Sequence, residues 1–231
     1  MPDPVIKLVI PALNEEDAIG GVVSSVIGKV DAVIVADNGS TDETSKRAKE
    51  AGASVVYVAE PGYGRACLAA IEHAGDYDIL VFMDGDASDD PDDLEALLAP
   101  LKSGEADMVI GSRILGDCDK GALTIQQRFG NTLACWLMYL FWGFRFTDLG
   151  PFRAITREAY DKLNMEAPTF GWTVEMQVRA LKHKLRCREV PVHYRARIGV
   201  SKISGTIRGV VLAGGYILGT IFKEAIWNRK P

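Results

Sequence analysis

The apolar residues of the chain form short runs that are separated by segments with helix-start signals. Five runs in the first half have the length and composition of strands buried on both faces of a parallel sheet. They cover residues 5–10, 32–36, 53–58, 79–83 and 107–111. The order strand, helix, strand repeats along this half. It predicts an α/β fold with a doubly wound, mostly parallel sheet, in which residues 1–113 form a nucleotide-binding half.

The fourth apolar run ends in Asp84-Gly85-Asp86. Two carboxylates at the carboxyl end of a buried strand can converge on one hard cation, which predicts a Mg²⁺ or Mn²⁺ site completed by phosphate oxygens. A DxD pair alone is also typical of a polar turn. An EF-hand calcium loop is excluded, because Asp89 stands where that loop requires glycine and a strand precedes the segment. Asp90 is predicted as an N-cap, with Pro91 opening the next helix.

Polar residues also follow the first two predicted strands, at the edge where open α/β sheets bind ligands. Asn14 is predicted as the N-cap of a helix that extends to about residue 27. Glu16 in its first turn either complements the helix dipole or contacts a nucleobase or ribose. Asp37 precedes a helix whose start is explained by a capping box over residues 40–43, so its carboxylate is available for a ligand.

Glycines and arginines follow the third and fifth predicted strands. Gly62, Gly64 and Arg65 open a helix, where they either make a turn or let backbone amides approach a phosphate. Arg113 comes directly after the fifth strand. Since the carboxyl ends of parallel strands meet at one edge, we expect these groups to lie near Asp84 and Asp86.

Two apolar helices are predicted in the second half. After a loop over residues 114–124, one helix extends from about residue 126 and is wholly apolar over residues 133–144, which is shorter than the roughly 20 residues of a membrane span. Its aromatic residues are typical either of a buried core helix or of an interfacial helix at headgroup depth. The tail, residues 206–227, is predicted as an apolar helix or hairpin that forms a membrane contact or a dimer interface.

The remaining second half supplies candidate acceptor groups. A strand over residues 148–155 and a helix over residues 170–184, with Glu175 in its first turn, precede a strand over residues 186–194. Four hydrogen-bonding or cationic residues follow within eight positions, which predicts either a phosphate clamp or a solvated basic loop. They are Arg195, Arg197, Ser201 and Lys202.

Charge is divided between the two halves. Residues 1–115 contain 8 Lys and Arg against 22 Asp and Glu, and residues 116–231 contain 18 against 9, within a net charge of −5. An acidic metal-binding half and a basic half suggest phosphorylated small molecules or an anionic membrane as partners. Nucleic acid is excluded, because no basic helix, RNP motif or zinc finger is present. Four scattered cysteines and no apolar signal segment favour a reducing, cytoplasmic compartment.

Eight motifs in order resemble those of family 2 glycosyltransferases with the GT-A fold. They are PALNEE, VADNGSTDET, PGYGRA, MDGDASDDP, IGSR, DLGPFRAI, GWTVEMQVRA and RIGVSK, and they cover residues 5–205. Within the family, the chain is most similar to the polyprenyl-phosphate (dolichyl-phosphate) mannosyl- and glucosyltransferases. The resemblance implies a catalytic domain over residues 1–205, with an acceptor half from residue 114, and a helical tail over residues 206–231.

The resemblance also implies roles for individual residues. Those implied for the nucleotide-sugar donor are Pro11, Asn14, Glu16, Asp37, Gly64, Arg65, Asp84 and Gly85, with Asp84 and Asp86 as metal ligands. Those implied for the acceptor or its phosphate are Arg128, Arg153, Arg195, Arg197, Ser201 and Lys202. Those implied for catalysis are Asp86, Arg113 and Glu175. Two departures stand out, Tyr63 in place of a lysine and Gly150-Pro151 in place of Ser-Gly before Phe152-Arg153.

The implied reaction is a single displacement with inversion, in which a cation and basic side chains stabilise the leaving nucleoside diphosphate. A polyprenyl phosphate acceptor is ionised at neutral pH and needs no strong base. A lipid acceptor also predicts a peripheral enzyme at the inner face of the cell membrane. A soluble hydroxyl acceptor such as a phosphorylated glycerate would need a strong base, with Glu175 or Asp148 as candidates. A non-catalytic nucleotide-sugar binding module is the third alternative, and a homodimer is compatible with each.

Overall fold

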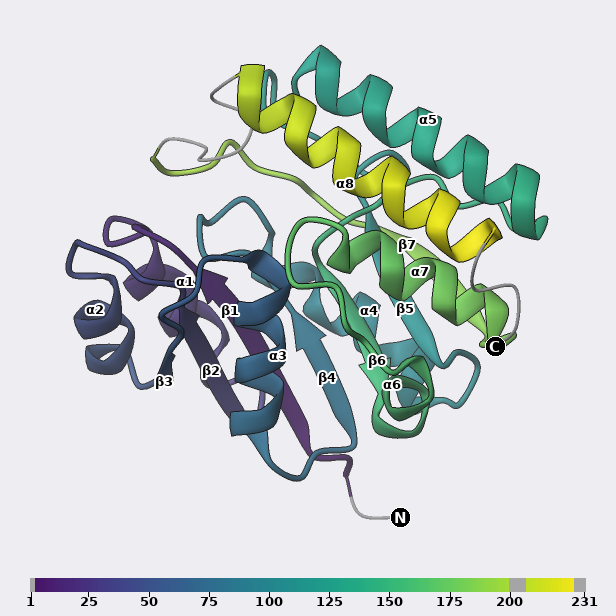
Figure 1. Ribbon diagram of the computed structural model, residues 1–231. Helices are drawn as coiled ribbons and strands as arrows, with labels where there is room; N and C mark the ends of the chain where they lie inside the picture. The colour runs from purple at the N-terminus through teal and green to yellow at the C-terminus, as the bar shows by residue number, and fades with distance from the viewer. Residues whose placement is uncertain (1–2, 200–206, 227–231) are drawn as a thin grey trace.

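One seven-stranded sheet connects both halves of the chain in the computed structural model, which describes residues 3–199 and 207–226 (Figure 1). The strands are β1 Ile6–Ala12, β2 Ala32–Asp37, β3 Ser54–Tyr57, β4 Ile79–Phe82, β5 Met108–Ser112, β6 Arg153–Thr156 and β7 Cys187–Pro191. Their order across the sheet is β3-β2-β1-β4-β6-β5-β7. All neighbouring pairs are parallel except those of β6, which is antiparallel to both β4 and β5. The predicted α/β fold with a mostly parallel sheet is confirmed.

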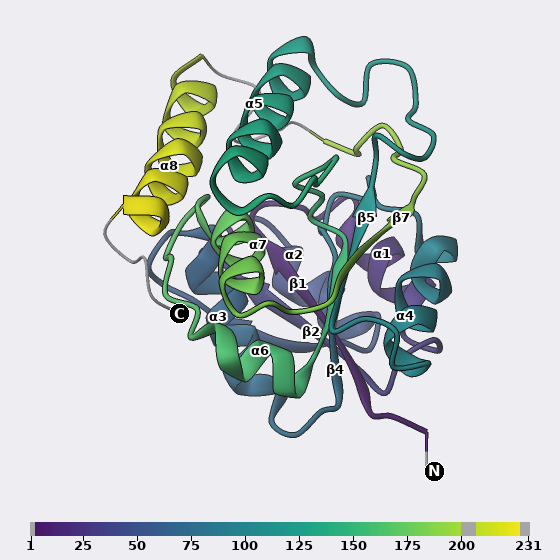
Figure 2. The ribbon, with the colours of Figure 1, turned by 90° about the vertical axis from the view of Figure 1, so that its right-hand side faces the viewer.

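Helices cover both faces of this sheet and form a further outer layer. They are α1 Ile19–Val26, α2 Thr44–Glu50, α3 Tyr63–Ala74, the 3₁₀ turn η1 Pro91–Asp93, α4 Leu94–Lys102, α5 Ile125–Trp142, α6 Arg157–Leu163, α7 Trp172–Lys182 and α8 Ile207–Ile226. Helices α1, α2 and α4 cover one face, and α3, α6 and α7 cover the other. Helices α5 and α8 lie side by side outside α7 (Figure 2). The predicted tail is therefore one helix, and the division of the chain at residue 205 stays a prediction.

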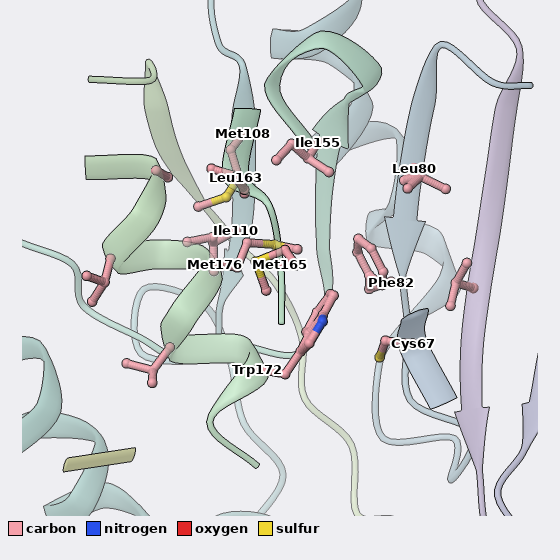
Figure 3. Packing of buried hydrophobic residues seen from close by; sticks show 14 of the residues in the cluster. Cys67, Leu80, Phe82, Met108, Ile110, Ile155, Leu163, Met165, Trp172 and Met176 are labelled. Carbon is pink, nitrogen blue, oxygen red and sulfur yellow. The ribbon is translucent and has the colours of Figure 1, made fainter. Parts of the chain in front are cut away.

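Alternation along the strands divides the apolar side chains between two cores. In β1, Leu8 and Ile10 face the α1 and α4 side, whereas Val9 faces α3. The second core centres on Trp172, which is fully buried and packs edge-on against Phe82 with ring centroids 4.8 Å apart (Figure 3). Such a pair contributes about 0.5–1.5 kcal/mol beyond its burial. Trp172 thereby fixes the start of α7 against the strand that carries the predicted metal site.

Asn14 does not cap a helix as predicted. Helix α1 begins five residues later, after Ala18, whose side chain makes no cap hydrogen bond. Asn14 instead has a φ of 53°, and its Oδ1 accepts a hydrogen bond from the Thr41 amide while its own amide donates to Ser40 Oγ. An Asn side chain tolerates this left-handed conformation and pairs locally with backbone groups. Asn14 therefore connects the loop after β1 to the loop after β2.

The predicted capping box over residues 40–43 is also wrong. Helix α2 begins at Thr44, and the Thr44 amide donates to the carboxylate of Asp42 rather than to Ser40. The Glu43 amide donates to the Glu16 carboxylate from the loop after β1. Contacts between the two loops supply the acceptors that a local capping box would otherwise provide. The predicted Asp90 cap is confirmed, since its side chain accepts from the Asp92 amide in η1.

Helix α5 has the buried side that a core helix requires, and its interfacial role at headgroup depth stays a prediction. A capping box of Thr124 and Gln127 starts it. Its inner side is buried in the second core through residues that include Ala134 and Met138, as a core helix requires. Its outer side exposes large apolar side chains, among them Phe129 and Trp136. Among the described helices, none is long and apolar enough to cross a membrane.

Candidate active site

The carboxyl ends of β1 and β4 open into a cavity of about 320 Å³ that both predicted metal ligands, Asp84 and Asp86, line. Its volume lies in the range of about 300–1,000 Å³ that is usual for small-molecule sites. The other lining residues come from six separate segments of the chain. They are Pro11, Ala12, Leu13, Glu15, Asn38, Pro61, Gly62, Tyr63, Ala66, Gly85, Phe170 and Arg197. Of the predicted donor residues, Pro11, Asp84 and Gly85 are thus brought together here.

The two carboxylates of the DGD segment differ in their surroundings. Asp86 Oδ1 accepts hydrogen bonds from the amide and the hydroxyl of Ser88, at 3.0 and 2.5 Å, and its Oδ2 lies 3.1 Å from Nη1 of Arg197. Burial, followed by the charge of Asp86, raises the pKa of Asp84 to about 7. The Tyr63 hydroxyl lies 3.4 Å from Asp84 Oδ1. Two carboxylates that repel each other at the wall of a cavity have the chemistry to share a divalent cation.

The protein's own side chains supply only part of the ligands that such an ion needs. Within residues 3–199 and 207–226, no group of three or more His, Cys, Asp or Glu side chains is arranged to hold a metal ion. Two carboxylates leave most of the coordination shell of Mg²⁺ or Mn²⁺ to other oxygen atoms. A bound diphosphate and water would have to complete the shell, as the sequence analysis predicted.

Asp89 is a site residue that the sequence analysis did not identify. It is buried, and its Oδ2 accepts a hydrogen bond of 2.9 Å from the amide of Asp84. Burial raises its pKa well above the usual value. Ala87, between the two, has a φ of 64°, so the chain turns sharply enough to bring Asp89 back onto Asp84. In the sequence, Asp89 stood out only as an acidic residue at the position where a calcium loop needs glycine.

The segment after β7 returns to the DGD segment. Backbone hydrogen bonds connect the Arg195 amide to the Ser88 carbonyl and the Ile198 amide to the Asp86 carbonyl. Between them, Arg197 lies in the cavity, but Arg195 pairs with Asp90 at 2.5 Å and is not among the lining residues. The two described arginines of the predicted clamp therefore point to different places: Arg197 faces Asp86, and Arg195 faces Asp90. Its other predicted members, Ser201 and Lys202, lie outside the described residues.

Arg113 is held by a buried carboxylate. Its Nε and Nη2 donate to the two oxygens of Asp148, each at 2.7 Å, and its guanidinium lies 5.0 Å from the ring centroid of Tyr194. Burial alone would lower the pKa of Arg113, but the charge of Asp148 outweighs it and raises this pKa above its ordinary value. Asp148 is completely buried. Asp148, a candidate base in the sequence analysis, thus positions the arginine that the sequence placed at the end of β5.

Arg113 also lines a second cavity, of about 690 Å³, between α5 and α8. Most of its wall is apolar, with polar groups near the start of α5. The other lining residues are Ile125, Gln126, Gln127, Phe129, Gly130, Asn131, Leu133, Leu149, Thr173, Ala213, Gly214, Ile217 and Leu218. Arg128, a predicted acceptor residue, is exposed on the same helix outside this wall. An apolar groove with an arginine in its wall suits an amphiphilic anion.

Asp37 does not point into the first cavity. Its Oδ1 accepts from the Ser40 amide at 2.8 Å, and its Oδ2 accepts from the Ser45 hydroxyl. The next residue, Asn38, lines the cavity, and its Oδ1 accepts from the Gly62 amide at 2.7 Å. Because side chains alternate along a strand, the residue just past the strand end takes the place that was predicted for Asp37. Asn14 and Glu16 likewise hold loops and are not among the lining residues.

Gly64 and Arg65 serve packing in this structure. A Cβ on Gly64 would lie 1.9 Å from the carbonyl oxygen of Ala167, so only glycine allows this approach of α3 to the loop before α7. Arg65 donates its amide to the Pro168 carbonyl and pairs with Glu60 at 3.0 Å. Neither residue lines the cavity of Asp84, and their predicted phosphate contact stays a prediction.

Glu175 and Arg153 are buried away from that cavity. Glu175 Oε2 accepts from the amides of Glu166 and Ala167, and its Oε1 lies 2.9 Å from Nη2 of Arg179. Burial raises its pKa. Arg153 is completely buried, donates to the carbonyls of residues 149, 150 and 173, and has its pKa lowered to about 10 by burial. Glu175 fixes the loop before α7, and Arg153 fixes the segment that contains Asp148, so the predicted direct roles are not what their surroundings favour.

Comparison with known proteins identifies the class of this fold and site. Residues 7–172 match the family described as Glycosyl transferase family 2. An uncharacterised glycosyltransferase of Mycobacterium bovis is 33% identical over 213 residues, which cover 90% of this chain and 94% of the relative. The UDP-N-acetylglucosamine–dolichyl-phosphate N-acetylglucosaminyltransferase of Methanococcus voltae is 28% identical over 216 residues, which cover 83% and 86%.

A solved structure shares the whole architecture. The crystal structure of glucosyl-3-phosphoglycerate synthase from Mycobacterium tuberculosis with Mn²⁺, UDP-glucose and phosphoglyceric acid is 25% identical, with a TM-score of 0.77 over 99% of this chain and 81% of that chain. Fold and site together define a nucleotide-sugar transferase of the GT-A type. The chain belongs to glycosyltransferase family 2 and is a hexosyltransferase. The predicted resemblance, including that to the polyprenyl-phosphate branch, is confirmed.

Proposed function

We propose that this glycosyltransferase moves a hexose from a uridine-diphosphate sugar to a polyprenyl phosphate at a membrane surface. The observation that carries the proposal is the apolar groove between α5 and α8, whose wall includes Arg113. A phosphate at the arginine and an isoprenoid chain along the apolar residues match the two kinds of surface in this wall. The name of the Methanococcus voltae relative, which contains both a UDP sugar and dolichyl phosphate, supports this pairing.

The state of the candidate bases also favours an acceptor that arrives ionised. Asp148 receives two hydrogen bonds from the Arg113 side chain, and Glu175 receives two from backbone amides. Both carboxylates are occupied by these contacts, and neither lines the cavity of Asp84. A phosphate monoester has a second pKa of about 6, so it is largely ionised at neutral pH and needs positioning rather than deprotonation. We infer attack by the phosphate oxygen at the anomeric carbon with inversion.

On the donor side, Asp84 and Asp86 would hold Mg²⁺ or Mn²⁺ next to the diphosphate, where the ion would supply charge neutralisation for the leaving group. Mn²⁺ accompanies UDP-glucose in the Mycobacterium tuberculosis structure, which supports a divalent ion here. Arg197, which contacts Asp86, is placed to neutralise the same developing charge. The cavity walls formed by Leu13, Asn38 and Tyr63 would receive the nucleoside and sugar.

We also propose that α5 and α8 contact the membrane that contains the acceptor, at the cytoplasmic side. Their exposed side, termed here the outer helix face, carries large apolar residues that are each at least 40% exposed. They are Ile125, Phe129, Trp136, Tyr139, Leu140, Phe141, Leu212, Tyr216, Phe222 and Ile226. Tryptophan and tyrosine settle at the depth of lipid headgroups. Lys223 in the last turn of α8 adds a cationic group near these residues.

The outer helix face can be tested by flotation. Substituting Trp136→Ser together with Leu140→Ser should reduce co-flotation with vesicles of anionic phospholipid at least about tenfold, since burying each side chain contributes roughly 1.5–3 kcal/mol. Tyr57→Ser is the matched control, because Tyr57 is 65% exposed on the edge strand β3, which lies on the opposite side of the molecule from α5 (Figure 1). Equal flotation of the double variant and the wild-type protein would contradict membrane contact. Monomerisation of a dimer by the double variant would assign the face to a second copy.

The reaction itself is tested by a donor and acceptor screen. UDP-glucose, UDP-N-acetylglucosamine and GDP-mannose are each supplied with Mn²⁺ or Mg²⁺, with either a short polyprenyl phosphate or 3-phosphoglycerate. Radiolabelled product in the organic phase with a UDP sugar is the expected result. The structural likeness to glucosyl-3-phosphoglycerate synthase favours the second candidate, a phosphorylated glycerate acceptor, and product confined to the aqueous phase would establish it. Nucleotide-sugar binding without any product would leave only the non-catalytic module.

A further inference from the structure

Arg197 occupies an unusual place for a residue predicted to bind the acceptor. Two backbone hydrogen bonds hold its flanking residues, Arg195 and Ile198, against the DGD segment at 2.8 and 2.9 Å. Its side chain therefore projects from a fixed backbone into the donor cavity, beside the predicted metal ligands. Any change in its contacts must come from rotation of the side chain alone.

The guanidinium of Arg197 bridges two carboxylates there. Nη1 lies 3.1 Å from Asp86 Oδ2, and Nη2 lies 2.8 Å from Glu15 Oε1. Nε is buried and has no hydrogen-bond partner within the part of the chain that the structure describes. A guanidinium has five N–H donors in a planar fork, and a buried donor without an acceptor is unfavourable. One donor of Arg197 is thus left for a group that the protein itself does not supply.

The position of the guanidinium conflicts with that of a metal ion. A divalent cation bound by Asp84 and Asp86 would use the Asp86 oxygen that now faces Arg197, since Oδ1 already accepts two hydrogen bonds from Ser88. Two cations at one carboxylate oxygen repel each other strongly where water is excluded. A diphosphate brings new anionic oxygens, and arginine binds such oxygens through two parallel N–H donors.

We propose that Arg197 is an internal counter-ion of the metal site, which it occupies in the free enzyme and leaves for the donor diphosphate when metal and nucleotide bind. The inference rests on the proposed function for its metal and its diphosphate. It makes Arg197 a donor-side residue. It also predicts that metal alone binds weakly, because the displaced guanidinium keeps only Glu15 and gains no new anion in place of Asp86. Metal and nucleotide then bind with positive cooperativity, and each raises the affinity of the other by the same factor.

The exchange is tested by titrating Mn²⁺ into the full-length protein and measuring free Mn²⁺ by electron paramagnetic resonance. Arg197→Gln should bind Mn²⁺ about tenfold more tightly than the wild-type protein in the absence of nucleotide, since a hydrogen-bonded ion pair no longer competes. Arg195→Gln is the matched control. It removes the same charge from the same segment but from a residue that contacts Asp90, so its Mn²⁺ affinity should stay within about twofold of wild type.

The second half of the experiment measures UDP affinity by calorimetry at saturating Mn²⁺. Arg197→Gln should bind UDP about tenfold more weakly than Arg195→Gln, because the diphosphate loses its arginine. Equal or weaker Mn²⁺ affinity of Arg197→Gln relative to Arg195→Gln would overturn the exchange. Tighter Mn²⁺ binding with unchanged UDP affinity would overturn the transfer to the diphosphate. A third outcome is that neither the wild-type protein nor either variant binds UDP, while the Mn²⁺ affinities of the two variants still differ. In that case the proposed function would fail and the counter-ion role would stand.

Discussion

Replacement of Asp86 by asparagine should lower kcat/KM about 10³-fold with little change in the fold. The amide keeps the shape of the side chain but removes the charge that faces Arg197 and the predicted metal, and groups that stabilise a leaving group's charge contribute about 10²–10³ in rate. The measurement is nucleoside diphosphate release at saturating Mn²⁺, with circular dichroism as a check of folding.

Asp92→Asn is the control for that substitution. Asp92 belongs to the same acidic segment but is exposed and pairs with Lys29 on the surface, so its replacement should leave kcat/KM within about twofold. Retention of full activity by Asp86→Asn, or of full wild-type activity in excess chelator, would contradict a metal site at the DGD segment. Loss of activity in both variants would point to a general effect of charge in this loop.

Replacement of Asp148 by asparagine should lower the free energy of unfolding by about 3–5 kcal/mol. Its carboxylate is completely buried and holds the guanidinium of Arg113, whose side chain is 13% exposed. Removing one member of a buried pair leaves the other charge without compensation, which is the reason for this large cost. Urea denaturation followed by circular dichroism measures the change.

Asp161→Asn supplies the comparison for the buried pair. Asp161 also pairs with an arginine, Arg157, but both side chains are more than 40% exposed. Exposed pairs contribute about 0–1 kcal/mol, so this variant should differ little from the wild-type protein. Equal destabilisation by the two substitutions would show that Asp148 stabilises through local packing rather than through Arg113. Asp148→Asn should also weaken turnover at temperatures where it remains folded, since Arg113 loses its orientation.

The strands and the edge at which the site lies were predictable from the sequence, because buried strands leave continuous apolar runs and the polar groups that follow them are local to each run. The run before Asp84 and the helix start at Pro91 are such cases, and both are confirmed. The place of β6 was not predictable. Strand β6 begins 74 residues after the start of β4 and 45 residues after the start of β5. Nothing in the local sequence distinguishes an antiparallel partner from a parallel one.

The roles of individual side chains were less predictable than their locations in the fold. Asn14 and Glu16 had the chemistry of a helix start, but contacts with the loop after β2 used them instead. The family resemblance assigned Arg153 to the acceptor, whereas its guanidinium is enclosed by backbone carbonyls that only the tertiary fold provides. Arg197 does lie in the cavity of Asp84, and its phosphate role stays a prediction. Its contact with Asp86 depends on a segment 111 positions away in the chain.

The antiparallel strand β6 has a mechanical consequence for the reaction. Through its ladders with β4 and β5, the strand that ends at the DGD segment and the strand that ends at Arg113 belong to one continuous sheet. A hinge that swung donor and acceptor halves together would have to break those ladder hydrogen bonds in every cycle. The distance between the DGD segment and Arg113 is therefore set during folding. Exclusion of water at the moment of transfer is then the task of side chains and loops around a rigid frame.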